Sequence, residues 1–233
     1  MKILGIESSS LTASAAIWED GILTAEYTVN FKKTHSQTLL PMIDEICRMT
    51  EQEPKTMDAI AVASGPGSFT GLRIGAATAK GLALALALPV VAVPTLDAMA
   101  YQCFDAVSVI CPIMDARRGQ VYNGLYEWEN GRFCIKQPSR AIDMAEVIEE
   151  LNAAGGPVIF LGDGVPVQEE QIRARLHVPF YLAPATMNRQ RAGAVASLGA
   201  EQYAQGRLLK AEEFAPKYLR PSQAERVRQE KNR

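Results

Sequence analysis

Histidine is almost absent from this chain, and cysteine is scarce. The two histidines, His35 and His177, lie far apart in the sequence, so a histidine-based metal site is not expected. The four cysteines show no Cys-x-x-Cys spacing, which is typical of reduced, mostly buried thiols in a cytosolic protein. They are Cys47, Cys103, Cys111 and Cys134.

The chain also lacks an excess of charge of either sign and a long hydrophobic run. Its formal net charge of −2 at pH 7 gives no support for strong nucleic-acid binding by this chain alone. The apolar run at residues 3–6 is too short for the core of a signal peptide. The most apolar stretch, residues 81–93, contains Pro89 and is shorter than a membrane span. These absences predict a cytoplasmic protein without a membrane helix.

The chain does contain enough apolar sequence for a proper core. Hydrophobic residues make up 48% and charged residues 21% of its 233 residues, which indicates a globular protein of one large or two small domains. Beyond Phe214 the basic residues outnumber the acidic ones. Residues 217–233 are therefore predicted to form a solvated, partly disordered tail, with contact to RNA or an acidic partner as the alternative.

A glycine-rich loop at residues 65–75 is the most distinctive local feature. It follows an apolar run at 59–63 that is typical of a buried strand, and it leads into a small-residue helical run at 71–88. Strand, glycine loop and helix together direct backbone N–H groups and a helix N-terminus at an anion. Either of two hydroxyl residues can cap the helix. The candidate phosphate-binding residues of the loop are Gly65, Gly67, Ser68 and Thr70.

The same loop has a second interpretation of at least equal weight. Gly71, Gly75 and Ala79 recur every four residues and therefore lie on one face of the helix. Such a face lets another backbone approach closely, whether or not an anion binds. Both interpretations stay open at this point.

Hydrophobic patterns predict the order β-β-β-α-β-α in each half of the chain. Asp20-Gly21 indicates a tight hairpin, Thr34-x-x-Gln37 resembles a capping box, and Pro41 predicts a bend or a later helix start. In the first half, strands are predicted at 2–7, 12–18, 22–30, 57–63 and 90–93, and helices at 36–50, 71–88 and 95–103. In the second half, strands are predicted at 107–114, 120–128, 132–136 and 158–161, and helices at 142–151 and 190–205.

This duplicated order resembles the α/β architecture of actin-like proteins (ASKHA, RNase H-like), in which two lobes face each other across a cleft. The lobes are predicted at residues 1–104, with the dimerisation helices, and at 105–216. In that fold, acidic residues at the first hairpin of each half approach nucleotide phosphates and a metal. Those places hold Glu7, followed by Ser8, and Asp115. The alternative is that both carboxylates only cap turns at strand ends.

The familiar catalytic motifs do not fit this sequence. The loop lacks the Lys-Ser/Thr pair of a Walker A motif, since Leu72-Arg73 follows Gly71. Its third glycine comes one residue too late for a dinucleotide-binding fingerprint. Ser68 lacks the flanking glycines of a nucleophile elbow, and neither histidine has an acidic partner nearby in the sequence. Composition and spacing therefore identify no catalytic group.

Five segments, in chain order, resemble the TsaB family, also called YeaZ. The glycine loop with its helix is the most specific of them, and the set covers the chain from residue 2 to about 220. The segments are 3–9 (ILGIESS), 35–41 (HSQTLLP), 65–75 (GPGSFTGLRIG), 115–122 (DARRGQVY) and 218–220 (YLR). The resemblance implies an accessory protein required to form N6-threonylcarbamoyladenosine in tRNA.

The resemblance also implies a subunit that is not an enzyme on its own. TsaD, the catalytic relative, carries a metal-binding HxxxH motif, and its two histidine places match Thr95 and Met99 here. A hydroxyl and a thioether do not replace imidazole well in that metal chemistry. By this resemblance the chain binds no metal or cofactor, and ATP and a metal ion belong to its partners.

The implied partners are a TsaD-type catalytic subunit and a TsaE-type ATPase, and tRNA is met only through the complex. The interface would use the helices that begin near His35 and Ser68, which pair with their counterparts or, in the isolated chain, with a second copy as a homodimer. The implied interface residues are His35, Leu39, Leu40, Ile43, Gly71, Arg73, Ile74, Gly75, Thr78, Ala79 and Leu82.

Two other classes of function stay open. The cleft residues Glu7 and Asp115, together with the glycine loop, would suit a nucleotide-binding phosphotransferase or hydrolase. A peptidase acting on its partner is a role that has been proposed within the family. The sequence shows no recognisable nucleophile–base pair to support it.

Overall fold

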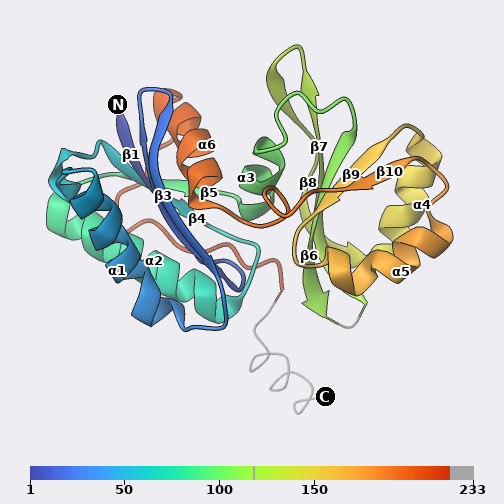
Figure 1. The fold of residues 1–233 in the computed structure, drawn as a ribbon, viewed down its shortest axis with the longest axis horizontal. Helices are drawn as coiled ribbons and strands as arrows, with labels where there is room; N and C mark the ends of the chain where they lie inside the picture. The colour runs from blue at the N-terminus through green and yellow to red at the C-terminus, as the bar shows by residue number, and fades with distance from the viewer. Residues whose placement is uncertain (118, 221–233) are drawn as a thin grey trace.

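The computed structural model describes residues 1–117 and 119–220. Two five-stranded mixed sheets form two lobes that lie side by side (Figure 1). The first lobe contains β1 (Lys2–Glu7), β2 (Thr12–Glu19), β3 (Ile22–Asn30), α1 (His35–Met49), a short 3₁₀ helix (Pro54–Thr56), β4 (Ala59–Ala63), α2 (Phe69–Leu86), β5 (Val90–Val93) and α3 (Thr95–Tyr101).

The second half of the chain runs from β6 to α6. Its elements are β6 (Val109–Arg117), β7 (Gln120–Glu129), β8 (Arg132–Asp143), α4 (Met144–Ala154), β9 (Val158–Leu161), α5 (Val165–Arg175), β10 (Phe180–Leu182) and α6 (Ala192–Ala204). Each half therefore contains the order β-β-β-α-β-α, and the predicted duplicated actin-like fold is confirmed. Among the described helices, none is both long enough and apolar enough to cross a membrane.

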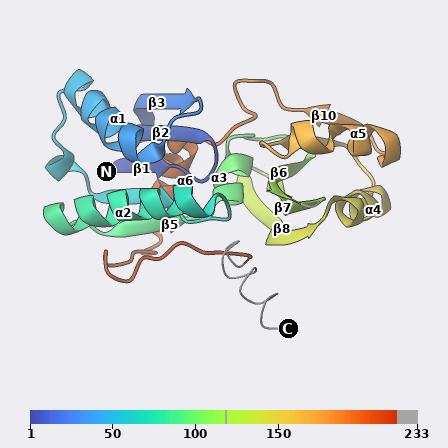
Figure 2. The ribbon, with the colours of Figure 1, turned by 90° about the horizontal axis from the view of Figure 1, so that it is seen from below.

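The first sheet has the strand order β3-β2-β1-β4-β5 and is covered on both faces. Side chains alternate along β1, so Leu4 and Ile6 pack toward α1 and α2 while Ile3 packs toward α6. A Cβ on Gly5 would lie 2.9 Å from the Cβ of Ala196, so this glycine lets α6 lie directly on β1. Figure 2 shows α1 and α2 lying together over the other face of the sheet.

The second sheet has the strand order β10-β9-β6-β7-β8. Helices α4 and α5 cover one face with a core that includes Ile148, Phe160 and Ile172. Helix α3 contributes Leu96 and Met99 to the core on the other face. Because α3 also contacts α6 and follows directly from the first sheet, it forms the joint between the lobes.

Several predicted details are confirmed. The Asp20-Gly21 turn has φ values of 46° and 89°, which is the left-handed pair that a type I′ hairpin requires. Gly206 follows α6 with φ 72°, as expected of a residue that ends a helix. The three strands that open the first half lie where the pattern placed them, whereas in the second half β8 runs on to Asp143, well beyond the predicted range of 132–136.

Other details of the first lobe are corrected. Helix α1 begins at His35 and continues through Pro41. The carbonyl that loses its partner there belongs to the exposed Gln37, so water can satisfy it. The capping box does not form, because the Thr34 side chain makes no cap bond and only the Gln37 N–H donates to the Thr34 carbonyl, at 3.0 Å.

In the second half, α5 and β10 were missed. Helix α5 buries only Val165, Gln168 and Ile172, which gives too weak an apolar pattern to predict a helix. Strand β10 has three residues and lies at the sheet edge. Residues 192–214 fall in the range predicted for the second lobe, 105–216, yet they pack on the first sheet.

Candidate functional site

The glycine loop folds tightly over the end of β1. Gly65 has φ 110°, and a Cβ there would overlap the carbonyl oxygen of Lys217. A Cβ on Gly67 would overlap the carbonyl oxygen of Ser9. The backbone N–H of Ser68 donates to that same Ser9 oxygen at 2.6 Å. These glycines therefore allow close contact with the chain's own backbone, and the Ser68 N–H is already used.

The small-residue face of α2 also packs inside the lobe. The Ser8 hydroxyl donates to the carbonyl oxygen of Gly71 at 2.9 Å. A Cβ on Gly75 would overlap that hydroxyl oxygen, and Ala79 is fully buried. The prediction that Gly71, Gly75 and Ala79 receive a partner chain is therefore wrong, because the two glycines lie against Ser8 and the alanine lies in the core of the first lobe.

The outward sides of α1 and α2 are formed by other residues. Leu39 and Ile43 are buried in the core of the first lobe, so they too are not surface residues. Leu40 is 53% exposed and Arg73 is exposed, as an interface residue must be, and Ile74, Thr78 and Leu82 are partly exposed. Sequence analysis missed a second small-residue stripe that faces solvent, made by Ala77, Gly81 and Ala85.

A cleft with a volume of about 870 Å³ lies between the two lobes. It brings together four of the predicted phosphate-site residues, which are Gly67, Ser68, Thr70 and Asp115. It also includes two residues that were predicted for the partner interface, His35 and Ile74. The remaining candidates, Glu7, Ser8 and Gly65, are buried and do not line the cleft.

Ser68 is the residue that caps α2 at the edge of this cleft. Its hydroxyl oxygen accepts from the Gly71 N–H at 3.3 Å, whereas Thr70 lies within the first turn. His35 donates through Nε2 to the carbonyl oxygen of Ser10 at 2.7 Å, and its buried Nδ1 has no partner among the described residues. The first turns of both helices are thus tied to the loop that follows β1.

Glu7 is a buried carboxyl group beneath the cleft. It is only 1% exposed, and its Oε1 accepts from the Ser9 N–H at 2.5 Å. Burial raises the pKa of Glu7 to about 7, the hydrogen bonds from Ser9 oppose that rise, and the negative charge of Asp163 adds to it. Burial also raises the pKa of Asp163. Glu7 is therefore partly protonated near neutral pH.

Asp115 has a local structural role. It is exposed at the end of β6, and its Oδ1 accepts from the Arg117 N–H at 2.7 Å. Arg117 has φ 64°, so this bond stabilises a left-handed residue in the turn. Turn capping, the second of the two interpretations of this residue, is what the structure shows directly.

The cleft lining carries charges of both signs. Its cationic residues are Lys33, Arg117 and Arg220, and its acidic residues are Asp115 and Asp163. An anion in the cleft would face both acids as well as the three cations. The charge pattern therefore does not by itself select a phosphate ligand.

Thr95 and Met99 lie on α3, where the lobes meet. They are 0% and 1% exposed, and Met99 packs in the core of the second lobe. In residues 1–117 and 119–220, no three His, Cys, Asp or Glu side chains form a group that could hold a metal ion. The two positions serve as core residues of the joint.

The segment after α6 was assigned by sequence analysis to the second lobe, up to residue 216, and to a solvated tail beyond it. Lys217 donates through its backbone N–H to the carbonyl oxygen of Ser64 at 2.7 Å, and Tyr218 and Arg220 line the cleft. Residues 217–220 therefore have a defined place on the protein, although Lys217 and Tyr218 are exposed to solvent, as predicted for this tail. The rest of that tail, residues 221–233, lies outside the described residues.

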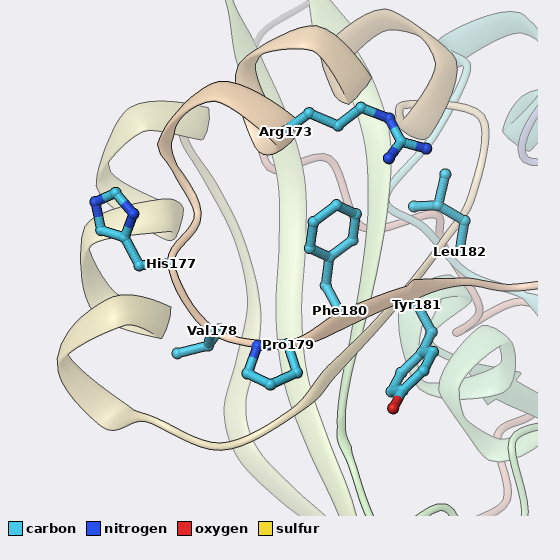
Figure 3. A pocket seen from close by; sticks show the side chains of 7 residues that line it. All are labelled: Arg173, His177, Val178, Pro179, Phe180, Tyr181 and Leu182. Atoms are coloured by element: carbon cyan, nitrogen blue, oxygen red, sulfur yellow. The ribbon is translucent and has the colours of Figure 1, made fainter.

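A second, shallow pocket of about 730 Å³ lies at the far edge of the second lobe (Figure 3). It is formed by α5 and the edge strand β10, with the guanidinium of Arg173 5.6 Å from the ring centre of Phe180. His177 lies at its rim, in the loop that joins the two elements. None of the predicted site residues lines this pocket.

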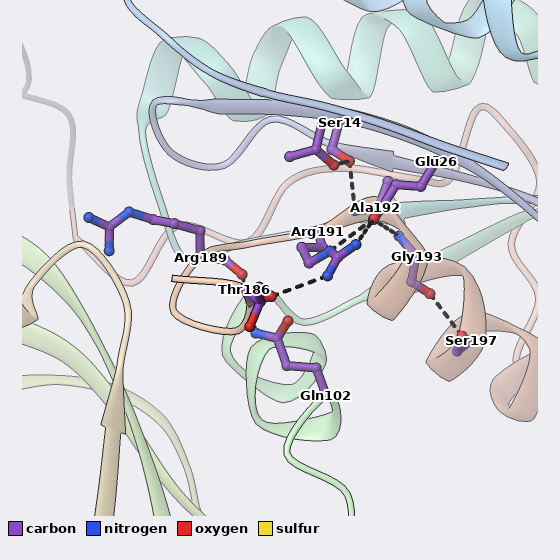
Figure 4. A network of polar contacts seen from close by, with 10 residues as sticks. Ser14, Glu26, Gln102, Thr186, Arg189, Arg191, Ala192, Gly193 and Ser197 are labelled. Carbon is purple, nitrogen blue, oxygen red and sulfur yellow. Dashed lines mark hydrogen bonds and ion pairs between the residues drawn. The ribbon is translucent and has the colours of Figure 1, made fainter. Parts of the chain in front are cut away.

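A polar network fixes α6 to the first sheet (Figure 4). Glu26 is buried and accepts hydrogen bonds from the Arg191 guanidinium and, at 2.8 Å, from the Gly193 N–H. The Ser14 hydroxyl accepts from the Ala192 N–H at 3.0 Å. Side chains of β2 and β3 thus satisfy the free N–H groups in the first turn of α6.

Comparisons with known proteins identify relatives of this chain. The family model for TsaD, described as tRNA N6-adenosine threonylcarbamoyltransferase, matches residues 26–227. The tRNA threonylcarbamoyladenosine biosynthesis protein TsaB of Bacillus subtilis is 35% identical over 225 residues, which cover 97% of this chain and 96% of the relative. TsaB of Escherichia coli is 29% identical over 226 residues, covering 94% and 95%.

Solved structures agree with the sequence relatives. YeaZ from Pseudomonas aeruginosa has a TM-score of 0.79 and 27% identity, covering 94% of this chain and 99% of that one. An inorganic polyphosphate/ATP-glucomannokinase from Arthrobacter has a TM-score of 0.51 and 12% identity, covering 88% and 99%. At that identity the likeness to the kinase concerns the fold alone.

Proposed function

This chain belongs to the TsaB family, and on that basis we propose that it is a non-catalytic accessory subunit in the formation of N6-threonylcarbamoyladenosine in tRNA. Its relatives in Bacillus subtilis and Escherichia coli are named for this biosynthesis, and they match almost the whole chain. A TsaD-type subunit would carry out the transfer itself.

The observation that carries the non-catalytic role is the nature of Thr95 and Met99. The resemblance to TsaD matches them to the two histidines of its metal-binding motif. Here both side chains are buried at the joint between the lobes, where they contribute to packing. The chemistry of a hydroxyl and a thioether does not suit the same metal, so the metal ion and ATP would belong to the partners.

The outward faces of α1 and α2 would form the partner interface. Leu40 and Leu84 are 53% and 56% exposed, large apolar side chains on neighbouring helices. Ala77 and Gly81 are also exposed on α2, and a Cβ on Gly81 would meet nothing within 4 Å. Such a surface suits close approach of another helix, from a TsaD-type subunit or, in the isolated chain, from a second copy.

The remaining partners would be met through that complex. A TsaE-type ATPase would be the third subunit, and tRNA would be bound by the assembly in the cytoplasm. The net charge of −2 is consistent with a chain that does not bind RNA strongly by itself.

A reconstituted reaction tests the proposal. Threonylcarbamoyl transfer to tRNA would be measured with TsaD-type and TsaE-type subunits, in the presence and absence of this chain. We expect turnover only when this chain is present, and no transfer by this chain alone with added metal. Transfer by the isolated chain, or equal turnover without it, would contradict the accessory role.

Nucleotide binding in the cleft is a second candidate. It is favoured by the start of α2, where Ser68 and Thr70 line a cleft that carries cationic as well as acidic residues. Calorimetric titration with ATP would test it, with Arg117→Ala as the cleft variant. Heat of binding that is lost in the variant would support it, whereas no heat with the wild-type chain would remove it.

A further inference from the structure

The segment that follows α6 is anchored first to the outside of the first lobe. We refer to residues 211–220 as the strap. Ala211 and Phe214 are buried in the core beside α2, at 5% and 1% exposure. The Lys80 ammonium on α2 donates to the carbonyl oxygens of Glu212 and Phe214, at 3.3 and 3.0 Å. The strap therefore has a fixed course along the helix, which Figure 2 shows.

The strap then passes over the glycine loop. The Lys217 N–H donates to the Ser64 carbonyl oxygen at 2.7 Å, directly after β4. The Lys217 carbonyl lies so close to Gly65 that any Cβ there would overlap it. Burial raises the pKa of the Asp97 carboxyl, and the hydrogen bond from Tyr126 and the charge of Lys217 oppose that rise. The glycine at position 65 therefore leaves room for the backbone of the strap.

The end of the strap reaches the second lobe. The ring centres of Tyr218 and Phe69 lie 4.6 Å apart. The Arg73 guanidinium lies 4.1 Å from the centre of the same Phe69 ring. Two residues further on, the Arg220 Nη1 donates to the carbonyl oxygen of Ala116 at 2.7 Å. Ala116 belongs to β6, so this hydrogen bond crosses the cleft.

The covalent connections between the lobes lie elsewhere. The chain crosses once between α3 and β6 and once between β10 and α6. Gln102 ties the two crossings together by donating to the carbonyl oxygens of Met187 and Arg189, at 2.9 and 3.2 Å. Beside them, the Tyr126 hydroxyl donates to Asp97 at 2.8 Å. These contacts form a joint, and the strap adds a separate, non-covalent link across the cleft.

We infer that the strap is a built-in clamp between the lobes, in which Tyr218 and Arg220 hold the cleft at one width. Tyr218 contacts Phe69, which in turn contacts Arg73, in the first turns of α2. The clamp therefore also orients the start of the helix whose outward face is exposed. The clamp needs no bound ligand, because the strap itself forms one wall of the cleft.

Distances between the lobes test the clamp directly. Spin labels would be placed at Glu53→Cys, before β4, and Glu170→Cys, on α5, in the full chain carrying Cys134→Ser. Both label sites are exposed and lie in different lobes. The distance distribution would be measured by pulsed electron resonance for wild type, for Tyr218→Ala/Arg220→Ala and for Arg207→Ala. Arg207 is an exposed control whose side chain makes no hydrogen bond to the described residues.

The clamp predicts a narrow distribution for wild type and for Arg207→Ala, and a broader one with a longer mean for the double variant. A double-variant distribution that superimposes on the wild-type one would overturn the inference. Circular dichroism during heating would show whether the double variant folds. If it does not fold, Arg220→Ala alone decides between the same two outcomes, because its side chain contributes one surface hydrogen bond.

Discussion

The hydroxyl group of Ser8 occupies the space that a side chain on Gly75 would need. A Cβ built on Gly75 overlaps the Ser8 oxygen, which is itself bonded to the Gly71 carbonyl oxygen at 2.9 Å. This contact explains why α2 can lie directly on the end of β1. The face of α2 that carries Gly71, Gly75 and Ala79 therefore packs inside the first lobe.

Alanine at two glycines of the same helix should have opposite effects. Gly75→Ala should lower the free energy of unfolding by about 1–3 kcal/mol, because Ser8 has to move. Gly81→Ala should raise it by about 0.5–1 kcal/mol, because its Cβ meets nothing and alanine favours the helix. Urea denaturation of both variants checks this. Equal effects of the two substitutions would contradict the assigned packing.

Glu7 should make the protein less stable as the pH rises toward neutrality and beyond. Its pKa is about 7 in the folded chain against an ordinary value of 4.5, so between these two pH values the folded state retains a proton that the unfolded state releases. The stabilising effect of that proton is complete below about pH 4.5 and is lost as the pH passes through about 7.

Glu7→Gln should therefore stabilise the protein at pH 8, by up to about 3 kcal/mol, since the amide oxygen can still accept from the Ser9 N–H. At pH 4.5 the two proteins should be nearly equal in stability. Denaturation at both pH values measures the difference, and Glu170→Gln, at an exposed position of α5, is a control. A difference that does not grow with pH would show that burial of the Glu7 charge is not costly.

Arg191→Ala should lower the free energy of unfolding, because it removes the charged group that holds the start of α6 against Glu26. Glu26 is only 8% exposed on its side chain, and the arginine is its charged partner. The loss should cost about 1–3 kcal/mol, less than for a fully buried pair because the Arg191 side chain is 42% exposed. Glu26→Gln in the same background should recover part of the loss, since no buried charge then remains. A change in the free energy of unfolding below 0.5 kcal/mol, about that of an ordinary surface substitution, would contradict this role.

Sequence patterns located all described strands except β10, together with the Asp20-Gly21 hairpin and the glycine loop, because each of these depends on neighbouring residues. Periodicity also showed that small residues follow one another at every fourth position of α2. It could not decide which of two stripes is buried, Gly71/Gly75/Ala79 or Ala77/Gly81/Ala85, since that depends on where Ser8 lies. The return of α6 to the first sheet depends in the same way on a distant pair, Glu26 and Arg191.

The course of the strap could not be predicted from the sequence for a related reason. Residues 211–220 carry no apolar period, and their course depends on single contacts with distant residues such as Lys80 and Ser64. The short pattern 218–220 was recognisable as a family feature, yet nothing in it showed that it crosses the cleft. The exposed face of α2 could likewise be identified only once its buried face was known.

Association with a TsaD-type subunit is the most direct test of the proposed function. Ala77→Arg places a long charged side chain on the outward stripe of α2, and Ala174→Arg makes the same change at an exposed position of α5. Co-purification of each variant and of wild type with the partner would be compared. We predict a stable complex for wild type and Ala174→Arg and its loss for Ala77→Arg. Equal binding by all three, or no binding by wild type, would contradict the assignment of this face as the partner interface.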